Sequence, residues 1–176
     1  MISLIVVFWM FVVLFGVIGA FRGWAKELLV VFSVVLALLL NFLLKKYVPI
    51  ISQLPDKEPA LFWIRALILV VLVFFGYQTV GMQHFAGKAA REKLQDSLLG
   101  FVFGAANGYL VVGTLWFYLD QAIYLSSSYI TSPVAGDPMG DAAINLLLAM
   151  PPRLMGEPVI YFVVALAFVF VIVVFV

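Results

Sequence analysis

Long uninterrupted runs of hydrophobic residues, separated by short polar segments, make up most of the chain. A helix needs about 20 consecutive apolar residues to cross the hydrocarbon core of a bilayer. By that measure the pattern predicts membrane spans at residues 2–21, 28–44, 60–80, 98–119 and 159–176. The runs lack the polar–apolar alternation of a transmembrane barrel. The sequence therefore predicts an all-α integral membrane protein, a bundle of four to five transmembrane helices.

The first two apolar runs leave two interpretations open. A polar break at residues 22–27, which contains a glycine, separates them, and the run at 28–44 is short for a full crossing. The pair therefore forms either two crossings or a re-entrant hairpin. The run at 2–21 has no Lys or Arg before it and is long for a signal peptide, so we expect a retained helix.

Two polar segments have the spacing of short amphipathic helices. Residues 84–96 place charged side chains around an apolar stripe, a pattern typical of a helix on the membrane surface. In the long loop 120–158, residues 141–150 begin at an aspartate suited to an N-cap and stop before two prolines. We expect an interfacial helix in each, a four-helix membrane domain over 1–119 and a C-terminal transmembrane helix at 159–176.

Composition narrows the possible partners and cofactors. Hydrophobic residues make up 66% of the chain and charged residues 11%, whereas a soluble domain is about half apolar and a quarter charged. Ten Lys and Arg against nine Asp and Glu give a net charge of +1, which does not form a nucleic-acid footprint. With no cysteine and a single histidine, the usual ligand clusters for metals are missing. We predict no nucleic-acid partner, no metal and no cofactor.

Motifs of catalysis are also missing from the sequence. It contains no nucleophile elbow, metalloprotease motif or P-loop. The predicted spans carry no internal carboxylate, the usual sign of a proton or ion relay. We therefore predict that the protein is not an enzyme and assign no catalytic residue.

The charges give only a weak indication of orientation. The positive-inside rule compares Lys and Arg in the short loops on the two sides, and here the two totals are equal. However, cations follow the first span and none precedes it, and acidic residues outnumber the one arginine in the loop 120–158. These features favour an outside N-terminus and an inside C-terminus.

The fourth predicted span carries a ridge of glycines, Gly100, Gly104 and Gly108, spaced four residues apart on one helix face. In lipid, such a ridge lets a neighbouring backbone approach closely. The neighbour is either another helix of this chain or a helix of a partner. Asn107 lies beside the ridge, and its amide is expected to hydrogen-bond to an adjacent helix.

Four further residues stand at predicted helix ends: Arg22, Gly23, Glu27 and Asp96. By composition alone, charged residues at such positions are interfacial anchors. A second hypothesis is that Arg22 and Asp96 form an ion pair that ties the first two helices to the fourth.

These residues carry a family resemblance. A first helix that ends in Arg22-Gly23-x3-Glu27, followed by a basic segment that leads into Asp96 and the glycine ridge, resembles the colicin V production protein family. The resemblance covers residues 1–120, and it departs from the family pattern at Ser97 and Asn107. It implies a multi-helix protein of the bacterial cytoplasmic membrane, required for producing and exporting a peptide toxin, linked with envelope homeostasis and without accepted enzymatic activity.

Two functions follow as expectations. The protein either serves export or envelope maintenance without catalysis, or it is an accessory or assembly subunit of a larger membrane complex. The expected partners are the lipid bilayer and other membrane helices, belonging to a second copy or to a larger complex.

Overall fold

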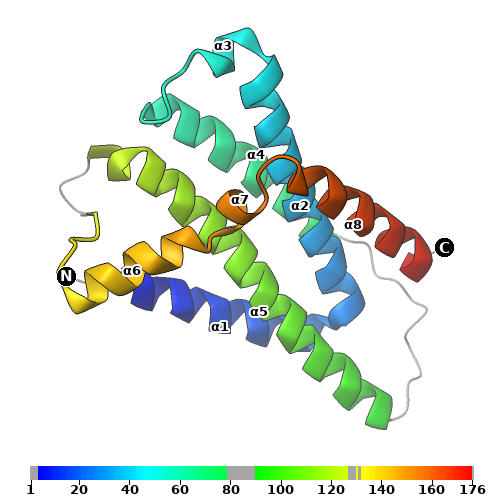
Figure 1. Cartoon of the computed structure of the whole chain (residues 1–176). Helices are drawn as coiled ribbons and strands as arrows, with labels where there is room; N and C mark the ends of the chain where they lie inside the picture. Colours follow the sequence, from blue (N-terminus) through cyan, green and yellow to red (C-terminus); the bar gives the residue numbers. More distant parts are fainter. Residues whose placement is uncertain (1–3, 79–89, 127–129, 131, 176) are drawn as a thin grey trace.

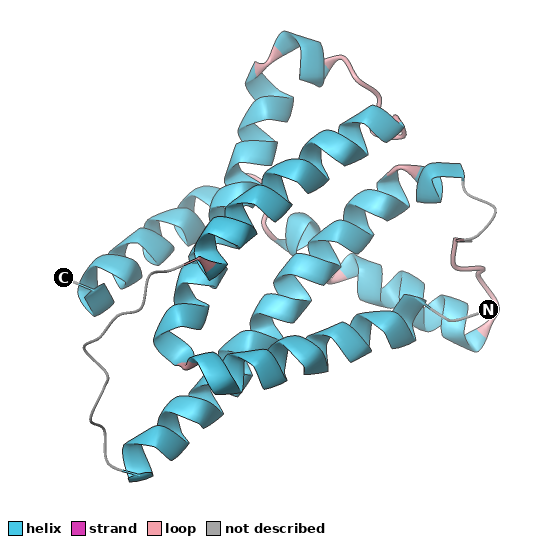
Figure 2. Cartoon of the chain, turned by 180° about the vertical axis from the view of Figure 1, so that it is seen from behind, coloured by secondary structure: helices cyan, strands magenta, loops and turns pink. Residues whose placement is uncertain are grey.

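The computed structural model describes residues 4–78, 90–126, 130 and 132–175, which form eight α-helices and no strand (Figures 1 and 2). Four helices are long and apolar enough to cross a membrane: α1 (Leu4–Arg22), α2 (Trp24–Tyr47), α4 (Pro59–Tyr77) and α5 (Ala90–Gln121). The shorter elements are α3 (Pro49–Ser52), η2 (Ile123–Ser126), α6 (Pro138–Leu148), α7 (Pro151–Leu154) and α8 (Val159–Phe175). The predicted class, an all-α membrane bundle, is confirmed.

The polar break between the first two helices is a single residue. Gly23 has φ 86° and ψ 154°, a conformation that is essentially restricted to glycine. Arg22 ends α1, and the residues from Trp24 onward are already helical. As a result, α2 has 24 residues and is longer than the predicted run at 28–44. Both α1 and α2 therefore have the length needed for a full crossing.

Both expected surface helices have other boundaries in the structure. Residues 90–96 are not a separate interfacial helix but the first turns of α5, because no proline or glycine interrupts the chain before Gly100. Residues 84–89 of that prediction lie outside the described part of the chain. In the long loop, α6 starts at Pro138, three residues before the predicted start, because Asp137 is its N-cap and accepts a 3.0 Å hydrogen bond from the Gly140 N–H.

The long helices alternate in direction. The glycines of α1 and α5 meet in reverse order, so these two helices are antiparallel. Ser33 and Asn41 of α2 meet Gly76 and Arg65 of α4 in reverse order, so α4 runs against α2 (Figure 1). The ring pairs Phe32–Phe168 and Phe42–Tyr161 show the same reverse order for α8. Successive membrane crossings require this alternation. Crossing by α8, which has 17 residues, stays a prediction.

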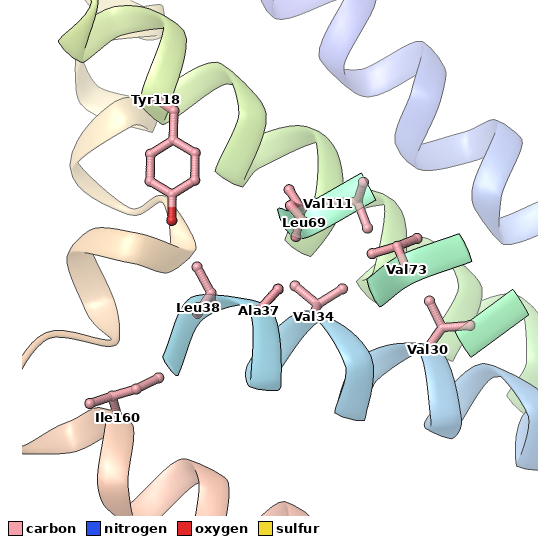
Figure 3. Packing of buried hydrophobic residues seen from close by; sticks show 9 residues of the cluster. All are labelled: Val30, Val34, Ala37, Leu38, Leu69, Val73, Val111, Tyr118 and Ile160. Atoms are coloured by element: carbon pink, nitrogen blue, oxygen red, sulfur yellow. The ribbon is translucent and has the colours of Figure 1, made fainter. Parts of the chain in front are cut away.

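The main core lies where α2, α4 and α5 meet (Figure 3). Four of its buried side chains come from α2, two each from α4 and α5, and one from α8: Val30, Val34, Ala37, Leu38, Leu69, Val73, Val111, Tyr118 and Ile160. A second cluster packs the start of α1 and the end of α5 against α6, around Phe8, Trp116 and Leu147. Large apolar side chains such as Phe74 and Val173 face outward, as expected for contact with lipid.

The glycine ridge of α5 packs inside the chain. A Cβ added at Gly19 of α1 would lie 2.7 Å from the Cα of Gly104, and one added at Gly108 would lie 2.9 Å from the Cα of Val12. Gly19 also contacts Gly100 through its backbone. The α1 backbone therefore covers the ridge, and this face is not available to a partner.

We predict that Gly104→Ala destabilises the protein by about 1–3 kcal/mol, the usual cost of overpacking, because the added methyl group must push α1 away. Thermal unfolding in detergent, followed by tryptophan fluorescence, measures the effect. Gly156→Ala is the matched control, since a Cβ at Gly156 meets no atom within 4 Å. Equal stability of the two variants would contradict the close contact between α1 and α5.

Candidate functional site: a buried polar junction at the α1–α2 elbow

A short ion pair closes over the elbow at Gly23. The Arg22 guanidinium donates to the Glu27 carboxylate at 2.6 Å, so the last side chain of α1 bonds to the first turn of α2. The Glu27 side chain is completely buried, and that of Arg22 keeps 20% of its surface exposed. Buried charges are costly unless they are paired, and here the guanidinium and the carboxylate serve as each other's counter-charge.

Asn107 connects the ion pair to α5. Its amide nitrogen donates to the second carboxylate oxygen of Glu27 at 2.8 Å and to the Glu27 backbone carbonyl at 2.9 Å. Asn107 is itself fully buried. Each oxygen of the Glu27 carboxylate thus accepts a hydrogen bond from a different helix. This is the inter-helix role expected of Asn107, and its partner is a buried carboxylate.

Arg22 also reaches the end of α4. Its guanidinium donates to the backbone carbonyl of Tyr77 at 3.0 Å and lies 4.3 Å from the centre of the Tyr77 ring. The last carbonyls of a helix have no partner within it and carry partial negative charge, which favours a cation. Arg22 therefore holds together α1, the start of α2 and the end of α4.

Two neighbouring side chains of α5 satisfy the helix ends at the elbow. Asp96 accepts a 3.3 Å hydrogen bond from the backbone N–H of Trp24, the first residue of α2. Ser97 donates to the carbonyl of Ala20 in the last turn of α1 at 3.0 Å. These are backbone groups that a helix leaves unpaired at its ends. A Cβ on Gly23 would lie 2.9 Å from the Asp96 carboxylate, so glycine also provides the space for this contact.

The residues singled out in the sequence converge on this junction, with two corrections. Glu27 is not an interfacial anchor, because it lies within the first turn of α2 and is covered by α5. The hypothesis of an Arg22–Asp96 ion pair is wrong. Arg22 instead bonds to Glu27 and to the Tyr77 carbonyl, and Asp96 accepts from the Trp24 N–H. The two charges nevertheless share one elbow.

Sequence reasoning missed two contributions. The Tyr77 carbonyl is a backbone group and leaves no trace in the sequence. Ser97 was visible only as a departure from the family pattern, although it follows Asp96 directly and can therefore reach the same elbow. The donors of the junction and its one buried carboxylate are bonded to one another, and this arrangement holds the helices in position. The buried amide oxygen of Asn107 has no hydrogen-bond partner among the described residues.

Fold and junction together define a helical membrane protein whose first two helices are joined at a glycine elbow and held by the fourth long helix. The chain belongs to the Colicin V production protein family, whose model matches residues 4–135. That match includes the elbow, the ion pair, Asn107 and the whole glycine ridge, so the resemblance is confirmed. Comparisons with curated proteins and with solved structures gave no match.

We predict that Glu27→Gln destabilises the protein by about 3 kcal/mol, because Arg22 loses its counter-charge. The value is at the low end for breaking a buried pair, since Arg22 is partly exposed. The double variant Arg22→Met, Glu27→Gln should recover part of the loss, because it leaves no unpaired charge. Thermal unfolding in detergent tests both variants.

Glu58→Gln is the control for this series, because Glu58 is an exposed carboxylate that precedes α4. It should leave stability unchanged within about 0.5 kcal/mol. Arg22→Met alone completes the series. A double variant that loses as much stability as Glu27→Gln and Arg22→Met added together would show that the two residues act independently, contrary to the pairing.

Proposed function

We propose that this protein is a non-catalytic component of the bacterial cytoplasmic membrane that serves export or envelope maintenance. Membership of the Colicin V production protein family supports the role. The observation that carries the proposal is the use made of the motif residues. Arg22, Glu27 and Asp96 bond to other helices of the same chain, and Glu27 is fully buried. Such groups are suited to holding an architecture rather than to acting on a substrate.

The second candidate is an accessory or assembly subunit of a larger membrane complex. Because α1 covers the glycine ridge, a partner would have to bind another face. The outward side of α4 is suited to this, since it presents Leu67, Val70, Phe74 and Phe75 to its surroundings. The same face is equally suited to lipid, so stoichiometry in the native membrane decides between the two candidates.

The functional test compares variants in a bacterium from which this protein has been deleted. Wild type should restore peptide-toxin export and envelope integrity. Arg22→Met, Glu27→Gln should restore both in proportion to its folded abundance in the membrane, because the pair supports structure alone. Glu58→Gln is again the control. A double variant that is folded and abundant but inactive would overturn the non-catalytic, structural role of the junction.

Gentle detergent extraction followed by native mass measurement separates the two candidates. A monomer or a homo-oligomer supports the independent export or envelope role. Stoichiometric co-purification of other membrane proteins supports the accessory role and counts against the first candidate.

For orientation we propose an outside N-terminus and an inside C-terminus. The cations that follow the first span support it, and the alternating helix directions are compatible with it. The chain has no cysteine, so single introduced cysteines report their side directly. A membrane-impermeant maleimide applied to spheroplasts should label Lys57→Cys and spare Lys93→Cys. The reverse pattern would invert the assignment.

A further inference from the structure

A second polar region lies at the opposite end of α2, where a cavity of about 210 Å³ opens between α2, α4, α5 and the segment that includes α7. Apolar side chains form much of its wall. Its polar lining consists of Asn41, Lys45, Arg65, Tyr118 and Gln121. Among the described residues that line it there are two cations and no carboxylate, so the cavity is suited to an anionic group.

Neighbouring groups compensate the cations only in part. Lys45 donates to the Leu54 carbonyl at 2.5 Å and lies 3.4 Å from the Asp56 carboxylate. Arg65 lies 3.4 Å from the same carboxylate oxygen and donates to Gln121 at 2.7 Å. Asp56 is itself 57% exposed, outside the lining of the cavity. One exposed carboxylate thus serves two cations that line the cavity.

Asn41 adds a buried acceptor that needs a donor. Its amide nitrogen donates to the Arg65 backbone carbonyl at 3.2 Å, and because a carbonyl can only accept, this contact fixes which way the amide points. The amide oxygen has no hydrogen-bond partner among the described residues, although only 5% of Asn41 is exposed. The oxygen itself is enclosed, so a hydroxyl group bound at this wall would supply the missing donor after the Asn41 side chain turns slightly toward the cavity.

The positions of the lining residues near helix ends indicate that the cavity lies at the depth of lipid headgroups. Lys45 is in the last turn of α2, Arg65 is near the start of α4, and Gln121 ends α5. Tyr47 and Trp63, two residues from Lys45 and Arg65, are largely exposed. Aromatic side chains of this kind gather at the membrane–water interface, and basic pockets between helices at that depth bind anionic headgroups.

We propose that this cavity binds the headgroup of an anionic glycerophospholipid that carries free hydroxyls, as phosphatidylglycerol does. The phosphate contacts Lys45 and Arg65 by charge-assisted hydrogen bonds, and a headgroup hydroxyl donates to Asn41. The volume is below the roughly 300–1,000 Å³ of pockets that enclose drug-sized ligands, so the acyl chains remain in the bilayer. This binding site is independent of the proposed function.

The test uses the full-length protein in nanodiscs that mix phosphatidylcholine, phosphatidylglycerol and phosphatidylmethanol, an anionic phospholipid without headgroup hydroxyls. Native mass spectrometry measures which lipids stay bound. Wild type should retain phosphatidylglycerol first, phosphatidylmethanol second and phosphatidylcholine least. Lys45→Gln should weaken retention of both anionic lipids about tenfold, the equivalent of 1.4 kcal/mol. Lys57→Gln changes an exposed lysine between α3 and α4 that does not line the cavity, and it should leave retention unchanged.

Asn41→Leu separates the two contacts. It should abolish the preference for phosphatidylglycerol over phosphatidylmethanol and keep the preference of both over phosphatidylcholine. Three results would overturn the proposal: wild type without lipid preference, equal loss in Lys45→Gln and Lys57→Gln, or displacement of the lipid by glycerol 1-phosphate at matched concentration. The last would assign the cavity to a soluble phosphate ester.

Discussion

The bundle depends on one buried charge and its partners. Glu27 is fully enclosed, yet each of its carboxylate oxygens accepts a hydrogen bond, one from Arg22 and one from Asn107. Because Arg22 also binds the end of α4, the same few contacts set the relative positions of α1, α2, α4 and α5. Apolar packing alone is a weak guide in lipid, where helices gain little by hiding hydrophobic surface from one another. The hydrogen bonds to the Glu27 carboxylate are directional, so they specify which helix faces meet.

The elbow poses a second requirement that α5 meets. A sharp bend between two helices leaves backbone donors and acceptors open, and where neighbouring helices enclose them these groups need partners from those helices. Asp96 and Ser97 bond to one such group on each side of Gly23. The glycine contacts farther along α5 then hold α1 close enough for these bonds to form. The two halves of the family motif, the elbow and the segment that begins at Asp96, therefore form one structural unit although they are far apart in the chain.

The sequence was sufficient for the class and for the approximate position of each long helix, because a crossing needs a contiguous apolar run. It was insufficient at the elbow, where adjacent charged residues resemble a solvated loop. Asn107, which bonds to the buried Glu27 from α5, is 80 positions away from it in the sequence. No local pattern encodes such a pairing. The start of α6 was misplaced for a simpler reason, since two aspartates could serve as its cap and Asp137 stands directly before a proline.

The length of α5 has a mechanical consequence. Its 32 residues extend about 48 Å at 1.5 Å per residue, whereas the hydrocarbon core is about 30 Å thick. Such a helix must tilt, or project beyond the bilayer by several turns. Tilt changes as the membrane thins or thickens, and α1 is bound along the same glycine face. Because the Glu27 contacts also tie α2 to both helices, a change of bilayer thickness would tilt α1, α2 and α5 together rather than α5 alone.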